Sequence, residues 1–107
     1  MRWRKKGAVM SCRKGKRMRF LHLRYAVAVA DTGSFTGAAR KMFVSQPTVS
    51  AGVAEVERAV EFQIFTRTNT GAVLTPEGAS FIKKARPVIA QMDLLEEEYV
   101  HDISLRG

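Results

Sequence analysis

A short run of small, uncharged polar residues in the middle of the chain carries the side chains best suited to specific hydrogen bonding. The stretch VSQPTVSAGV, residues 44–53, sets Gln46, Thr48 and Ser50 between valines. A glutamine amide can form two hydrogen bonds with adenine, hydroxyls reach bases or phosphates, and a proline ring or threonine methyl fits against a thymine methyl. These residue types indicate a surface that could read nucleic acid, provided that the surrounding elements place them on one face.

Residues suited to catalysis or metal binding are scarce by comparison. Cys12 is the only cysteine, so no internal disulfide and no cysteine-based zinc cluster can form. His22 and His101 are the only histidines and show no metal-ligand spacing. The acidic residues at 96–98 and 102 are most simply a solvated helix face. The sequence therefore predicts no enzyme, no cofactor and no metal site.

The positive charge of the chain is confined to its first residues. Residues 1–17 contain eight of the 18 basic residues and none of the ten acidic ones, so residues 18–107 contain ten of each. The net charge of +8 therefore belongs to a basic N-terminal arm, which we expect to be disordered when free. The arm lacks the apolar core of a signal peptide, and no stretch is apolar for the roughly 18 residues that span a membrane. We therefore expect a cytoplasmic protein.

Three helices are expected to position the polar run. The apolar stretch 20–30 predicts a central helix that ends at 31–33, and Ser34 is the expected cap of a short helix over 35–42. Ser45 caps the third, which runs to about Val60 with valines at 49, 53, 56 and 60 on its buried side. The outward side is then formed by Gln46, Thr48, Ser50, Ala51, Gly52, Glu55 and Arg58.

A hairpin and a long final helix follow. Residues 64–68 and 72–74 are β-prone runs around the turn sequence NTG, where Gly71 supplies a positive backbone angle. Thr75 caps a helix that begins at Pro76 and is about 38 Å long if it spans 25 residues. Its apolar seam predicts dimerisation, although residues 81, 82 and 85 also suit the chain's own core. The seam comprises Ile82, Ala85, Ile89, Met92 and Leu95.

This order of elements predicts a mainly α fold with a small β-hairpin wing. Three short helices followed by a hairpin form a winged helix-turn-helix, in which the third helix enters the major groove with its N-terminus first. The long helix that follows is the expected dimerisation, or linker, helix. Accordingly, we divide the chain into the arm 1–17, a winged helix-turn-helix 18–75, a linker helix 76–101 and a tail 102–107.

The motifs along this plan resemble the N-terminal DNA-binding domain of LysR-type transcriptional regulators. The resemblance covers roughly residues 18–92 and rests on LRYAVAVADTGSFTGAARKMFVSQPTVS, VERAVEFQIFTRT and LTPEG at their spacings. It implies a sequence-specific regulator that binds double-stranded promoter DNA at dyad-related sites as a homodimer paired through the linker helix. It also implies a role in DNA binding for Ser34, Thr36, Ser45, Gln46, Pro47, Thr48, Ser50, Ala51, Arg67 and Thr70.

Within that set the resemblance assigns different contacts to different positions. Gln46 and Pro47 match base-contacting positions, and Thr48 and Ser50 match contacts to bases or backbone. Ser34 and Thr36 match phosphate contacts at the start of the second helix. Arg67 matches a position beside the wing that serves backbone contact or wing structure.

Three positions depart from the family pattern. Ala51 and Thr70 stand where many relatives have arginine, and Glu61 stands where glycine is usual after the third helix. The loss of two arginines should weaken attraction to phosphate and flatten the salt dependence, whose slope is roughly −0.9 per phosphate neutralised.

The two ends of the chain leave alternatives open. Family members begin close to the equivalent of Met18, so residues 1–17 are either an artefact of start-site choice or an arm that restores attraction to DNA. Family members also continue into an effector-binding domain that supports higher oligomers, so we expect a fragment, a truncated product or a short form. Two other functions remain as alternatives: an interaction module that pairs with full-length relatives, and a non-specific nucleic-acid binder driven by the arm.

Overall fold

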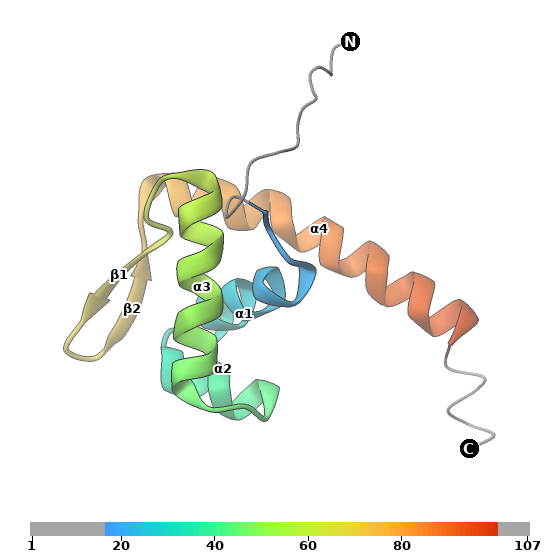
Figure 1. Ribbon diagram of the computed structural model, residues 1–107, viewed down its shortest axis with the longest axis horizontal. Helices are drawn as coiled ribbons and strands as arrows, with labels where there is room; N and C mark the ends of the chain where they lie inside the picture. Colours follow the sequence, from blue (N-terminus) through green and yellow to red (C-terminus); the bar gives the residue numbers. More distant parts are fainter. Residues whose placement is uncertain (1–16, 101–107) are drawn as a thin grey trace, which may run out of the picture.

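The computed structural model describes residues 17–100. The basic arm up to residue 16, Cys12, His101 and the tail 102–107 lie outside the described residues. Figure 1 shows helices packed around α1, a hairpin beside α3, and α4 projecting from this body. The elements in chain order are α1 (Phe20–Thr32), α2 (Phe35–Met42), α3 (Gln46–Val60), β1 (Phe65–Thr68), β2 (Gly71–Leu74) and α4 (Pro76–Tyr99).

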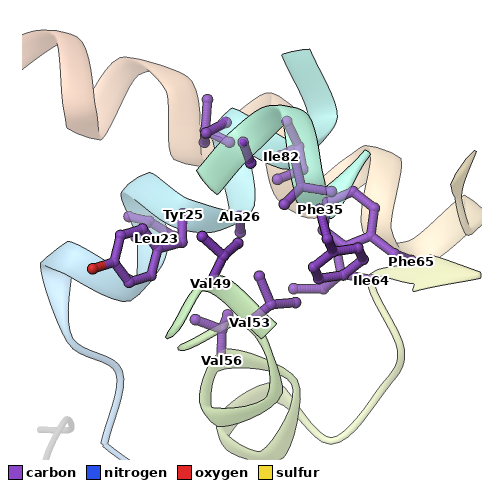
Figure 2. Packing of buried hydrophobic residues seen from close by; sticks show 14 of the residues in the cluster. Leu23, Tyr25, Ala26, Phe35, Val49, Val53, Val56, Ile64, Phe65 and Ile82 are labelled. Carbon is purple, nitrogen blue, oxygen red and sulfur yellow. The ribbon is translucent and has the colours of Figure 1, made fainter. Parts of the chain in front are cut away.

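The core forms around α1, as its apolar sequence predicts. α1 packs against α2, α3 and α4, and this central position explains why it is apolar on most sides. Val49, Val53 and Val56 of α3 are buried against it, which confirms the predicted valine stripe, while Val60 is only partly covered. Figure 2 shows these valines facing the side chains of α1, with Phe35, Phe65 and Ile82 completing the core.

Caps and left-handed residues set the helix boundaries. The Ser34 hydroxyl accepts from the Gly37 N–H at 2.8 Å, and the Ser45 hydroxyl accepts from the Thr48 N–H at 3.2 Å. Gly33 ends α1 with φ 77°, so these three predicted cap positions are confirmed. α2 ends at Phe43 with φ 61°, a conformation that bulky residues rarely adopt.

The hairpin forms where the sequence predicts it, with one shift in its bounds. The strands pair antiparallel from Phe65 opposite Leu74 to Thr68 opposite Gly71. Gly71 has the expected positive φ, 154°, and a Cβ there would lie 2.2 Å from the Gly33 carbonyl oxygen. Ile64, expected to begin the first strand, precedes it instead. Its side chain is fully buried, and its N–H bonds a side chain of α3 rather than the opposite strand.

α4 has a covered half and an uncovered half. The Thr75 hydroxyl caps it by accepting from the Gly78 N–H at 2.9 Å, and Pro76 begins it, as predicted. Ile82 and Ala85 are only 2% and 5% exposed, within the chain's own core. The prediction that these two residues contact a second subunit is therefore corrected, because the body of the same chain already covers them. Beyond them α4 extends away from the body (Figure 1).

Ion pairs hold the middle of α4 against α1. The Arg86 guanidinium lies 2.7 Å from the Asp31 carboxylate, and the Arg24 guanidinium pairs with Asp93, about two turns further along α4. The two pairs have opposite polarity on two antiparallel helices, so they favour one alignment of α4 on α1. None of the helices in the described part of the chain combines the length and apolarity needed to cross a membrane.

Candidate functional site

The N-terminal turn of α3 presents the small polar residues that the sequence singled out. Pro47 and Thr48 are exposed and Gln46 is half-buried, while Val49 on the opposite side is fully buried. The Thr48 and Ser45 hydroxyls lie 2.7 Å apart, so each can hydrogen-bond the other. The helix therefore offers an amide, hydroxyls and a proline ring to solvent at its positive end, a combination suited to base edges or phosphate.

The next turn of α3 corrects one part of the predicted outward face. Ala51 is exposed, as expected, but Gly52 is buried. A Cβ at Gly52 would lie 2.5 Å from Cδ2 of Tyr25 and 3.0 Å from Cδ2 of His22. Gly52 is therefore small because α1 packs directly on it, and it does not belong to the solvent-facing surface.

Arg67 of the wing contacts both helices of this surface, α2 and α3. Its guanidinium donates a hydrogen bond to the Ser50 hydroxyl of α3. The same guanidinium lies 3.7 Å from the centre of the Phe35 ring at the start of α2. Phe35 in turn packs edge-to-face on Phe65 of β1, with ring centres 5.8 Å apart. The arginine thus touches side chains from α2 and α3 while its own backbone belongs to β1.

A backbone contact brings the wing to the start of α2. The Ala72 N–H donates to the Gly33 carbonyl at 2.9 Å, immediately before Ser34 and the first turn of α2. Thr36 is exposed in that turn, and Thr70 is exposed at the hairpin tip, where its hydroxyl lies 3.5 Å from that of Thr68. The predicted residues of α2, α3 and the wing are therefore linked through Gly33, Phe35 and Arg67.

Two residues that shape this surface were missed by the sequence analysis. Glu57 of α3 accepts from the N–H groups of Ile64 and Phe65, and so fixes where the wing leaves α3. Its spacing within a helix carries no signal for such a contact. Phe43, in the turn between α2 and α3, is 93% exposed. Its place in the short turn just before the Ser45 cap is the one signal in the sequence that this aromatic side chain lies outside the core.

The charged residues further along α3 pair with each other. The Arg58 guanidinium lies 2.6 Å from the Glu55 carboxylate, one turn earlier on the exposed side. A hydrogen bond and the positive charge of Arg58 lower the pKa of Glu55 below its usual value. This arginine is therefore already engaged by a carboxylate and lies away from the N-terminal turn of the helix.

A second surface of different character lies on the uncovered half of α4. An apolar groove of about 540 Å³ runs between the start of α1 and the end of α4. Leu94 and Leu95 are 57% and 54% exposed there. The lining residues are Phe20, Val88, Gln91, Met92, Leu94, Leu95 and Glu98.

Within residues 17–100, no three His, Cys, Asp or Glu side chains gather as a metal site would require. His22 is packed against Tyr25, with ring centres 6.0 Å apart.

Comparison with a family model gives a match over residues 20–79 to the bacterial regulatory helix-turn-helix proteins of the lysR family. The small neutral protease regulatory protein of Streptomyces coelicolor is 42% identical over 77 residues, which is 72% of this chain and 24% of that protein. The HTH-type transcriptional regulator TfdS of Cupriavidus pinatubonensis is 39% identical over 72 residues, or 67% of this chain and 24% of TfdS. The chain thus spans about a quarter of the length of these relatives.

Solved structures of DNA complexes have the same fold. The CbnR DNA-binding domain in complex with DNA superposes with a TM-score of 0.70 at 28% identity, covering 76% of this chain and 93% of that one. The BenM DNA-binding domain in complex with the catB site 1 DNA gives a TM-score of 0.71 at 33% identity, covering 76% and 90%. The predicted winged helix-turn-helix fold is confirmed.

Proposed function

The chain belongs to the lysR family of bacterial regulatory helix-turn-helix proteins, and from this premise we propose that it binds a specific promoter sequence as a transcriptional regulator. The proposal rests on the capped N-terminal turn of α3, which carries Gln46, Pro47 and Thr48, and on the hydrogen bond from Arg67 of the wing to Ser50 in the next turn of the same helix. In this proposal the turn enters the major groove, the wing lies along the neighbouring backbone, and the chain carries out no catalysis.

Each contact follows from the chemistry of the exposed group. Gln46 has both a donor and an acceptor on one amide, which matches N6 and N7 of adenine. Pro47 offers only apolar surface, which suits a thymine methyl. The hydroxyls of Thr36 and Thr48 can donate to bases or phosphate oxygens. The Ser34 and Ser45 hydroxyls each accept a cap hydrogen bond from a backbone N–H, and the helix N-termini that they cap offer further N–H groups to phosphate.

The charge distribution supports recognition through short polar groups. Ala51 and Thr70 carry no charge at positions flanking the α3 turn and at the wing tip. Few phosphates are then neutralised by residues 18–107, and affinity should depend weakly on salt. We therefore expect this surface to contribute more to preference for one DNA sequence over others than to overall affinity for DNA.

We also propose that the uncovered half of α4 pairs with a second copy of the chain. Leu94, Leu95 and Val88 are exposed along the apolar groove, and burial against an equivalent helix would remove that surface from water. Met92 is partly buried and lines the same groove, whereas Ile89 packs against the chain's own core. A symmetric pair would present two α3 helices to the two halves of a dyad-related site.

Selection from random DNA followed by competition with scrambled sequence tests the first proposal. The 107-residue chain should enrich a dyad-related motif and bind it more tightly than a scrambled duplex of equal composition. If no motif is enriched and binding vanishes in moderate salt, the chain is instead a non-specific binder driven by its arm. If it binds no DNA but forms mixed dimers with full-length relatives, it is an interaction module.

Sedimentation equilibrium tests the second proposal. Leu95→Glu should dissociate the dimer, because the charged carboxylate would be buried in an apolar interface. Lys83→Gln also changes the net charge by −1, at an exposed position of the same helix, and should leave the dimer intact. A monomeric wild-type chain at all accessible concentrations would contradict the pairing.

A further inference from the structure

Arg67 forms two contacts that converge on the exposed face of α3. Its side chain hydrogen-bonds Ser50 of α3, and its guanidinium carbon lies over the Phe35 ring, 3.7 Å from the ring centre. Phe35 is buried, so its ring is a fixed platform for the cation. A guanidinium held against such a ring keeps one orientation more strictly than a free surface arginine, because stacking and hydrogen bonding restrict the same planar group.

The contact with Arg67 determines the hydrogen-bonding polarity of Ser50. A serine hydroxyl has one donor and two acceptor positions. Arg67 has no acceptor, so in this pair it donates and the Ser50 oxygen accepts. The Ser50 hydrogen is therefore left for another partner. The adjacent positive charge favours a partner that accepts and disfavours one that donates.

We infer that Arg67 is a positioning residue that makes Ser50 a hydrogen-bond donor toward an acceptor atom on DNA. This inference rests on the proposed DNA-binding function. The acceptor is either a phosphate oxygen or a base atom such as purine N7, since both are presented to a helix in the major groove. In this inference Arg67 acts through Ser50, and its guanidinium does not contact a phosphate directly.

The same geometry explains how the wing is kept in register with α3. Arg67 belongs to β1, whose start is fixed by Glu57, and its side chain returns to α3 two turns before that point. The wing is therefore attached to α3 at two separated places. Loss of the Arg67 contact would release both the Ser50 hydroxyl and the position of the hairpin.

A double-mutant cycle on DNA affinity tests the inference in the 107-residue chain. Arg67→Gln and Ser50→Ala should each weaken binding to the selected site by about tenfold, as expected for loss of a charge-assisted hydrogen bond. In the Ser50→Ala background, Arg67→Gln should have little further effect. Additive losses would overturn the inference, as would an Arg67→Gln variant that binds as tightly as the wild type.

The salt dependence separates positioning from direct contact. A positioning residue leaves the slope of log Kd against log salt unchanged, whereas loss of one phosphate contact reduces it by about 0.9. Lys84→Gln removes one positive charge from an exposed position of α4 and serves as the matched control for charge alone. A slope reduced by Arg67→Gln but not by Lys84→Gln would overturn the inference.

Modified DNA identifies the acceptor. A neutral methylphosphonate tests the phosphate source and 7-deazapurine tests the N7 source, and one of them should weaken wild-type binding but not Ser50→Ala binding. If removal of a base amino group has that effect instead, Ser50 accepts and the assigned polarity is wrong.

Two checks keep the outcome interpretable. Circular dichroism verifies folding, and Arg67→Lys provides a second variant that keeps the cation but loses the planar stack; it should also lose the coupling to Ser50. A wild-type chain that binds no DNA would refute the proposed function itself, whereas specific binding with uncoupled variants refutes only the role of Arg67.

Discussion

The Glu57 carboxylate of α3 accepts a hydrogen bond from the backbone N–H of Ile64 at 2.7 Å, and the same oxygen lies 3.2 Å from the N–H of Phe65. These amides lie where the chain enters β1, and the side chain of Ile64 is fully buried there. A single carboxylate thus satisfies two backbone donors that the hairpin does not pair. The relationship fixes the exit of the wing from the helix that we propose to read DNA.

Replacement of Glu57 should destabilise the fold. Glu57→Ala leaves both N–H groups without this acceptor and should lower the free energy of unfolding by about 2–6 kcal/mol, since each of the two unsatisfied donors costs about 1–3 kcal/mol. Glu57→Gln keeps an acceptor oxygen and should cost less. Urea denaturation followed by circular dichroism measures both. Equal stability of the alanine variant and the wild type would show that the contact contributes nothing.

Gly52 should not tolerate alanine, although alanine normally stabilises a helix interior. A Cβ at this position would meet the Tyr25 ring at 2.5 Å, and Tyr25 is only 4% exposed. Gly52→Ala should therefore lower the free energy of unfolding by about 1–3 kcal/mol through overpacking, against a gain of about 1 kcal/mol from helix propensity alone. The sign of the change in thermal midpoint decides between the two effects.

Phe43 should be replaceable with a gain in stability. It holds φ 61° with its side chain 93% exposed, so it has conformational strain with almost no burial to offset it. Phe43→Gly should raise the free energy of unfolding by about 1 kcal/mol, because a left-handed conformation costs other residues about 1–2 kcal/mol. Phe43→Ala removes the same ring but keeps a Cβ, and should show no such gain. A destabilised glycine variant would mean that the ring has a stabilising contact.

The ion pairs between α1 and α4 should affect the orientation of α4 more than the stability of the fold. Asp31→Asn breaks the pair with Arg86 at half-exposed side chains, and such pairs contribute about 0–1 kcal/mol. We expect the unfolding midpoint to change little, while the preferred spacing between the two halves of a selected DNA site becomes less strict. Site selection with the variant, compared with wild type, measures this; an unchanged spacing preference would argue that apolar packing alone aligns α4.

Much of the fold was predictable because its signals are local. Ser34, Ser45 and Thr75 are residue types that favour helix N-caps, and the structure places each at the start of a helix. The valine stripe of α3 faces the core for the same reason, since helical periodicity places those side chains on one side.

What escaped prediction depends on contacts between distant segments. Gly52 looked like part of a small outward face, yet Tyr25, 27 positions earlier, occupies the space beside it. Ile82 and Ala85 continue the apolar seam of α4, and no pattern within that helix marks where the body stops covering it. The pairing of Arg67 with Ser50 joins residues 17 positions apart across a turn, so neither residue signals it alone.

Sequence reading by the N-terminal turn of α3 can be tested by a fluorescence-anisotropy titration of wild type and Gln46→Ala on the selected site and on a scrambled duplex, at two salt concentrations. We expect wild type to prefer the selected site and Gln46→Ala to lose about 1–3 kcal/mol of that preference, with the salt dependence unchanged. Equal binding of both proteins to both duplexes, weakening steeply with salt, would contradict the claim that the N-terminal turn of α3 reads sequence.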